Sequence, residues 1–398
     1  MATIPKDENG KIPELQLVRA MAIICVLSVH ASASATVAMK ESGYYYFYNF
    51  INIFMKIGTP TFILLSSFVL FYSYYSRPID IKLIAGFYKK RLLYIMIPYV
   101  VFSAVYFLLT QRYGHHPILS RESLLLFGQK LIAGKAFAHL YFVFISIQFY
   151  LLFPLLLAAV QRWKAIARWL VPLGFAVQWG FVLLNKYAWQ VPDKGSWSLS
   201  YFSFFMLGAA MGIYYPKIKN GLLNRNNQKR KVRAYRIGWS VIWSVWLMLS
   251  MAHVTIYFNA RSYGTRYDSL WYELLWNFQC VFAALALFQA AFFIQKYWPG
   301  FVSRPLHRLG QYSFGIYLIH LLFLLFYDRY MPGFGISWPS HFRYLGSWLV
   351  MLGASWATVE LAARFVPFAW IGFGNLPRSA EASRHFPQTP TIQPHSVP

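Results

Sequence analysis

The sequence predicts an all-α, polytopic membrane protein, and three observations support this. Hydrophobic residues make up 58% of the 398 residues and charged residues only 12%, a composition unlike that of soluble domains. Several apolar stretches reach about 18 residues or more, the length that crosses the core of a bilayer as a helix. Most Lys and Arg residues lie between these stretches. We therefore expect about ten transmembrane helices.

The expected spans follow one another along most of the chain. They are residues 13–38, 45–75, 86–110, 139–161, 165–186, 197–215, 234–257, 269–295, 311–330 and 343–371. The second span is long enough to be kinked or doubled. Residues 121–137 are too short and polar to cross, and we expect an interfacial or re-entrant helix there.

The chain is expected to form one membrane domain, residues 12–373, without a separate soluble domain. Residues 1–11 are predicted to be a cytoplasmic N-terminal segment. Residues 374–398 are rich in Pro, Ser and Gln, a composition that predicts a disordered cytoplasmic tail.

The formal net charge of +25 first suggests nucleic-acid binding, but its distribution favours a membrane. With ten spans the loops alternate sides, and the larger share of Lys and Arg, including the basic run 217–236, falls on the side of both termini. Positive charge of this kind marks the cytoplasmic side. Both termini are therefore predicted to be cytoplasmic, and the basic run is better explained by topology and anionic lipid than by nucleic acid.

The first span contains an arginine and a histidine, Arg19 and His30. Eleven steps are close to three helical turns, so both side chains share a face and lie about 16 Å apart along the axis. Such groups are costly within a membrane, and their presence there suggests function. The guanidinium suits phosphate, although Arg19 alone would equally suit an anchor at the helix start. A structural histidine is the alternative for His30.

Further charged and titratable groups lie at or near predicted spans. Lys89, Lys90 and Arg91 open the third span, where they are either topology determinants or part of a basic vestibule with Arg19 for an anionic ligand. His139 begins the fourth span at its outer face, and His320 lies within the ninth.

Other polar residues lie at membrane depth. They are Asn49, Asn52 and Lys56 in the second span, Glu273 in the eighth, and Glu360 with Arg364 in the last. The last two are four residues apart on one helical face and are expected to form a structural ion pair. No pair of histidines has the spacing of metal ligands and acidic residues are scarce, so no metal site is expected.

Several motifs, in order along the chain, carry a resemblance to a known family. They are Arg19 and His30 as Arg-x10-His, Gly58-Thr-Pro-Thr-Phe-Ile-Leu-Leu-Ser66, Lys89-Lys-Arg-Leu-Leu-Tyr-Ile-Met-Ile-Pro98-Tyr99, His139-Leu-Tyr-Phe-Val, Phe205-Met-Leu-Gly208-Ala-Ala-Met-Gly212 and Tyr312-Ser-Phe-Gly-Ile-Tyr-Leu-Ile-His320. The chain thereby resembles the acyltransferase-3 family of integral membrane O-acyltransferases. The third-span motif is most similar to the intercellular-adhesion branch, which acts on poly-N-acetylglucosamine. Tyr94 stands where many members carry a second arginine.

The resemblance implies a multi-pass protein of the bacterial plasma membrane that transfers an acetyl or succinyl group. The donor would be cytoplasmic acyl-CoA, and the acceptor a hydroxyl of an extracellular or cell-envelope polysaccharide. Arg19 with Lys89, Lys90 and Arg91 would hold the phosphorylated head of the donor. His30 would act as general base or as a transient acyl carrier. His139 and His320 are assigned to acceptor positioning or proton relay, and Glu273 to the acceptor.

This mechanism requires a continuous passage from Arg19 to His30. The alternative function is a polysaccharide exporter or flippase with a basic inner vestibule. Transporters are often built from paired repeats with broken helices, and the sequence contains no such repeat. The Arg-x10-His motif favours the enzyme, because export needs no titratable group in register with a phosphate-binding arginine.

Overall fold

The computed structural model describes residues 12–115, 117–118, 120–223 and 229–377, with the side chains of 220–235 excepted. The predicted N-terminal segment 1–11, residues 378–398 of the predicted tail and most of the basic run 217–236 therefore lie outside the described residues or side chains. The regular elements of the described residues are all helices, and these residues contain no strand.

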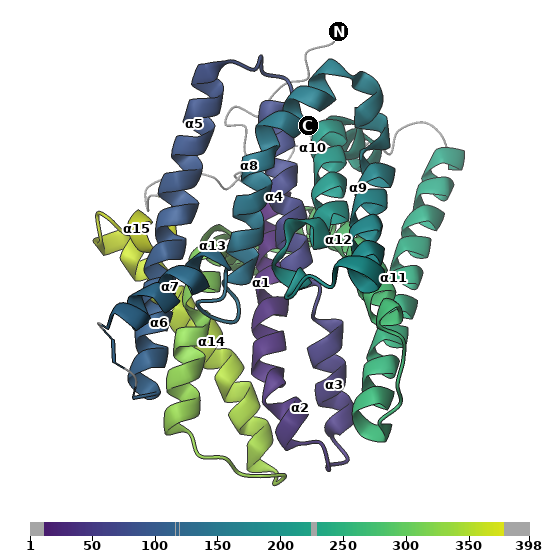
Figure 1. Ribbon diagram of the computed structural model, residues 1–398. Coiled ribbons are helices and arrows are strands. Elements are labelled where there is room, and N and C mark those ends of the chain that lie inside the picture. Colours follow the sequence, from purple (N-terminus) through teal and green to yellow (C-terminus); the bar gives the residue numbers. More distant parts are fainter. Residues whose placement is uncertain (1–11, 116, 119, 224–228, 378–398) are drawn as a thin grey trace, which may run out of the picture.

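The helices follow one another with short connections (Figure 1). Their bounds are α1 Pro13–Ala33, α2 Ala35–Ala38, α3 Tyr45–Phe54, α4 Gly58–Tyr74, α5 Ile81–Arg91, η1 Leu92–Met96, α6 Ile97–Tyr113, α7 Arg121–Ile132, α8 Tyr141–Arg162, α9 Lys164–Leu184, η2 Asn185–Trp189, η3 Lys194–Ser196, η4 Ser198–Tyr201, α10 Phe202–Leu223, α11 Lys229–Tyr263, α12 Ser269–Tyr297, α13 Gly300–Tyr330, α14 Pro339–Phe365 and α15 Trp370–Phe373.

Within the described residues, nine helical segments are long and apolar enough to cross a membrane. They overlap nine of the ten predicted spans, and the all-α polytopic prediction is confirmed. The predicted span 197–215 begins instead with the 3-10 turn η4 and continues as α10, which is not among the nine. The expected kink in 45–75 is the break between α3 and α4, and residues 121–132 form the short helix α7.

Helix α1 lies at the centre of the bundle, packed mainly against α13, α4, α12, α3 and α14. It runs from the end that carries Arg19, here called the Arg19 end, to the opposite end, where α2 and α3 lie (Figure 1). This opposite end is called the α2 end. The central place of α1 explains why its two polar side chains meet residues from so many other helices.

Glycines allow the neighbours of α1 to approach its backbone. A Cβ atom at Gly310 of α13 would lie 1.8 Å from the carbonyl oxygen of Gln16, and one at Gly58 of α4 would lie 2.7 Å from that of Ala22. Close approach through small residues is the usual basis of helix association in membranes. These two contacts fix α1 on both sides of Arg19.

Helix α10 packs against α4 in the same way. A Cβ at Gly208 would lie 2.2 Å from the carbonyl oxygen of Leu64, and one at Gly212 would lie 2.5 Å from that of Phe68. The Gly208–Gly212 pair is the small-xxx-small pattern that lets two backbones meet. These contacts explain the burial of α10 between α4 and α9.

Gly310→Ala is expected to destabilise the protein by about 1–3 kcal/mol, because even one methyl group must push α13 away from α1. Gly353→Ala in α14 is the matched control, since a Cβ there has no atom within 4 Å. Thermal unfolding of the detergent-solubilised protein, followed by size-exclusion chromatography after heating, measures the difference. Equal unfolding temperatures for the two variants would contradict the close packing of α1 and α13.

Candidate active site

A cavity of about 530 Å³ lies between α1, α4, α5, α8 and α13 near the Arg19 end. Its wall contains three cations, Arg19 of α1 and Lys90 and Arg91 of α5. None of them forms an ion pair with a described residue. Three positive charges around one cavity, without a carboxylate beside them, suit a ligand with several negative charges.

The two arginines are held in different ways. Arg19 is half-buried, and its Nη1 donates to Gln16 Oε1 at 3.4 Å. The guanidinium of Arg91 lies 4.9 Å from the ring centre of Tyr150, and its buried Nε has no hydrogen-bond partner. Tyr150 is itself oriented by a hydrogen bond of 2.8 Å with Ser66. Most of the donors of both guanidinium groups therefore remain available to a ligand.

The wall of the cavity includes a π-helical turn, Leu92–Met96, which precedes Pro98. Proline has no N–H and displaces the carbonyl four residues earlier, here that of Tyr94. This carbonyl lies against Gly374, where a Cβ would be 2.6 Å from it and φ is +72°. The widened turn lets consecutive side chains, Tyr94 and Ile95, line the cavity, and such turns are frequent at functional sites.

Three histidines from distant parts of the chain meet on the other side of the cavity's inner wall. The ring centres of His30 and His320 are 5.1 Å apart, as are those of His320 and His139. His139 and His320 are buried, with 1% and 0% of their surface exposed, whereas His30 is partly exposed. The structure thus brings together the histidines that the sequence analysis singled out from the first, fourth and ninth spans.

The hydrogen bonds of the two buried histidines define their tautomers. His320 Nδ1 lies 2.7 Å from the carbonyl oxygen of Tyr317, and His139 Nε2 lies 3.2 Å from that of Leu318. A carbonyl oxygen only accepts, so each of these nitrogens carries a proton in the neutral ring. The other nitrogens, His320 Nε2 and His139 Nδ1, are buried lone pairs without a partner. Unpartnered buried groups are rare and commonly belong to functional sites.

A tyrosine hydroxyl hydrogen-bonds to two backbone groups of α13 next to these rings. Tyr106 of α6 donates to the carbonyl oxygen of Leu318 at 2.9 Å and accepts from the backbone N–H of Leu322 at 3.0 Å. Those two backbone groups would bond to each other in a regular helix, and an inserted side chain is a known cause of a local distortion. His320 lies within this opened turn.

Three aromatic rings separate the cavity from the histidines. Phe62, Phe142 and Tyr317 line the cavity and contact one another, with ring centres 5.0–6.3 Å apart. On its other side Tyr317 contacts His139 and His320, at 5.3 and 5.7 Å. These three rings are called the aromatic layer. The expected continuous passage from Arg19 to His30 is therefore interrupted, because none of the three histidines lines the cavity.

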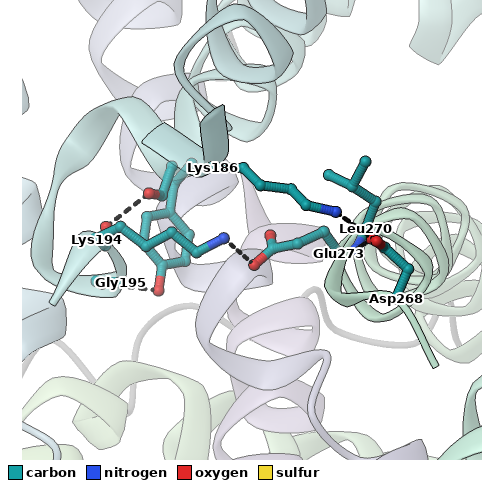
Figure 2. A network of polar contacts seen from close by, with 8 residues as sticks. Lys186, Lys194, Gly195, Asp268, Leu270 and Glu273 are labelled. Carbon is teal, nitrogen blue, oxygen red and sulfur yellow. Dashed lines mark hydrogen bonds and ion pairs between the residues drawn. The ribbon is translucent and has the colours of Figure 1, made fainter. Parts of the chain in front are cut away.

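Two predicted ligand-binding residues lie elsewhere. Lys89 is exposed on α5 and does not line the cavity, whereas Lys90 and Arg91, the next two residues, do. Glu273, assigned to the acceptor, forms an ion pair of 2.5 Å with Lys194 (Figure 2). Its charge is thus already paired within the protein.

The second ion pair in Figure 2 joins Lys186 to Asp268 at 2.5 Å. The Lys186 ammonium holds the pKa of the Asp268 carboxyl below its usual range. Together with the Glu273 pair it ties the segment 186–194 to the start of α12. Since the folded-state pKa is lowered, Asp268 contributes stability at neutral pH that is lost as the pH falls through that pKa.

Two other predictions can be compared with the structure. The Glu360–Arg364 ion pair is confirmed, at 2.5 Å, and Arg308 also approaches Glu360 at 3.6 Å. Of the predicted tail, which begins at 374, residues 374–377 are described; Asn375 lines the cavity and Leu376 packs on the core. Within the described residues no group of three or more His, Cys, Asp or Glu side chains has the geometry of a metal site.

Sequence reasoning did not single out Tyr106, Tyr317, Phe62 or Phe142. Aromatic residues make up 20% of the chain, so no single ring is conspicuous. Tyr317 stands three residues before His320, on the same helical face, and that spacing was the one available signal.

A helical membrane bundle with a cationic cavity on one side of an aromatic layer and a histidine cluster on the other is the architecture of an integral membrane enzyme. The chain matches the Acyl_transf_3 family, described as an acyltransferase domain, over residues 12–360, and it belongs to that family. It is a multi-pass membrane acyltransferase.

One curated relative is a protein of Bacillus subtilis (strain 168) named "Putative membrane-bound acyltransferase YfiQ". The two are 24% identical over 327 residues, which cover 79% of this chain and 82% of the relative. No solved structure gives a significant match to the chain.

Proposed function

We propose that this protein transfers an acetyl or succinyl group from acyl-CoA to a hydroxyl of an extracellular or cell-envelope polysaccharide. One observation carries the proposal: only the ring of Tyr317 lies between the His30–His320–His139 cluster and a cavity whose three cations form no ion pair with a described residue. In this proposal the Arg19 end faces the cytoplasm of a bacterium, in agreement with the distribution of positive charge.

The cavity has the chemistry expected for the head of acyl-CoA. Arg19 and Arg91 offer planar guanidinium groups and Lys90 a mobile point charge, a combination suited to phosphates. The pantetheine arm and thioester would then extend toward Phe62, Phe142 and Tyr317. The aromatic layer separates the cavity from the histidines until the acyl group displaces the rings.

The partly exposed His30 is one turn from the end of α1 at the α2 end and makes no hydrogen bond within the described chain. An acceptor hydroxyl from that end would reach it directly. His30 takes the hydroxyl proton, the hydroxyl oxygen attacks the thioester carbonyl carbon, and the C–S bond breaks. The released CoA thiolate takes up a proton. His320, whose ring centre lies 5.1 Å from that of His30 and whose Nε2 has no partner among the described residues, would relay the proton from His30 to the thiolate.

The experiment is to incubate the purified full-length protein in nanodiscs with acetyl-CoA or succinyl-CoA and a glycan fragment. Poly-N-acetylglucosamine fragments are the first acceptor, because the third-span motif resembles that branch. Mass spectrometry of the glycan and release of CoA thiol measure transfer. Ester-linked acyl groups on the glycan are expected. A glycan whose mass is unchanged, but which crosses proteoliposome membranes, would instead identify an exporter.

A further inference from the structure

Asn49 and Asn52 of helix α3, with Lys56 in the turn that follows it, form a polar stripe within the span Tyr45–Tyr74 that the proposed reaction does not use. Asn49 and Asn52 are three residues apart and share one face of the helix. Asn49 Nδ2 donates to the carbonyl oxygen of Val254 in α11 at 3.1 Å, and Asn52 Nδ2 donates to that of Val29 in α1 at 3.2 Å. The stripe therefore connects α11 with the residue that precedes His30.

Arg261, near the end of α11, completes this cluster. Its guanidinium donates to Asn49 Oδ1 at 3.1 Å and to Asn52 Oδ1 at 3.5 Å. Arg261 lies 5.0 Å and Lys56 4.5 Å from the ring centre of Tyr257. Both cations thus lie close to the ring of Tyr257. Asn52 connects Arg261 to α1 at the residue before His30.

Both charges lack a counter-ion. Neither Lys56 nor Arg261 forms an ion pair with a described residue, and Glu273, on the neighbouring helix α12, is paired with Lys194. Both side chains are partly exposed and therefore accessible. Unpaired charges at membrane depth are costly and usually mark a ligand path.

A buried histidine adds a hydrogen-bond acceptor to the two cations. The ring of His253 lies 5.1 Å from that of Tyr257, and its exposed fraction is 1%. Gln279 Nε2 donates to the carbonyl oxygen of Phe54 at 3.1 Å, so Gln279 Oε1 must accept the 2.6 Å bond from His253 Nδ1. His253 Nε2 is left as a lone pair without a partner.

We propose that Lys56, Arg261 and His253 bind an acidic sugar of the acceptor glycan. The two cations would hold its carboxylate, and His253 Nε2 would accept from a hydroxyl of the same sugar. An anionic phospholipid headgroup offers the same charge and, in phosphatidylglycerol, hydroxyl groups as well, so the experiment below includes a lipid addition that separates the two. This inference rests on the proposed transfer to a glycan, and it adds an acidic sugar to the features expected of a preferred acceptor.

The test is direct binding without acyl-CoA, so that it does not depend on catalysis. Full-length protein in phosphatidylcholine nanodiscs is titrated calorimetrically with a hyaluronan tetrasaccharide and with the same tetrasaccharide after reduction of its carboxyl groups. The wild type is expected to bind the acidic form about tenfold more tightly. Lys56→Gln with Arg261→Gln should reduce the preference to less than about twofold.

Several controls make the outcome specific. Lys40→Gln removes an exposed charge at the same end and should leave the preference unchanged. Arg261→Lys keeps the charge and should retain most of the preference if the loss in Arg261→Gln is electrostatic rather than structural. His253→Leu should weaken binding of both tetrasaccharides about equally, because it removes the hydroxyl partner.

The proposal would be overturned if the wild type showed no preference, or if Lys40→Gln abolished it as completely as the double variant. Loss of binding on addition of phosphatidylglycerol to the nanodiscs would assign the cations to lipid headgroups and also overturn it. Failure of acyl transfer, with the preference intact, would instead count against the proposed function alone.

Discussion

His30→Ala is expected to lower kcat for acyl transfer by about 10²- to 10⁴-fold, the usual contribution of a general base. The KM for acyl-CoA should remain close to that of the wild type, because His30 does not line the cationic cavity. Steady-state release of CoA thiol by the purified protein in nanodiscs measures both quantities. His115→Ala is the matched control, since His115 is exposed and lies outside the cluster.

Rapid-quench mass spectrometry of the wild type without acceptor distinguishes the two roles open to His30. If His30 acts as a general base, this measurement should find no acylated protein. If it carries the acyl group, a labelled peptide containing His30 should accumulate before acceptor is added. Transfer by His30→Ala at the wild-type rate, in protein that folds normally, would remove His30 from both roles.

Arg19→Gln is expected to raise the KM for acyl-CoA about 10- to 100-fold, with a smaller effect on kcat. The loss corresponds to the roughly 1.5–3 kcal/mol contributed by hydrogen bonds to a charged group. Arg91→Gln should behave similarly. Lys89→Gln is the matched control, because Lys89 belongs to the same basic run but is exposed and away from the cavity wall.

Substrate truncation tests the reason for this effect. Acyl-pantetheine lacks the nucleotide and its phosphates, so Arg19→Gln and the wild type should use it with the same KM. An equal loss with acyl-CoA and acyl-pantetheine would show that Arg19 supports the helix rather than the phosphates. An effect of Lys89→Gln as large as that of Arg91→Gln would indicate general surface charge instead of the cavity.

The membrane class and the order of the helices could be predicted because they depend on local composition. An apolar stretch long enough to cross the hydrocarbon core is recognised from the sequence of that stretch alone. The break between α3 and α4 was also predicted from length alone. The limits of α10 were not predicted. They depend on packing, through the 3-10 turn at Ser198–Tyr201 and the contacts of Gly208 and Gly212 with α4.

The candidate site was predicted in part. Helical spacing placed Arg19 and His30 on one face, and the structure places them on opposite sides of the aromatic layer. The meeting of His30 with His139 and His320 depends on contacts between helices far apart in sequence. Glu273 could not be excluded as a ligand, because its partner Lys194 lies in a 3-10 turn whose position the sequence does not define.

The sequence by itself determined the membrane-spanning helical class, the register of Arg19 and His30 on one helix and the cationic start of the third span. These features follow from period and composition, which are properties of neighbouring residues. Only the tertiary structure decided that three histidines touch, that Tyr317 closes the cavity before it reaches them, and that Lys56 and Arg261 form no ion pair within the part of the chain that the structure describes. Each of these depends on which helices meet, and helix association in a membrane is set by surface fit between side chains rather than by hydrophobicity.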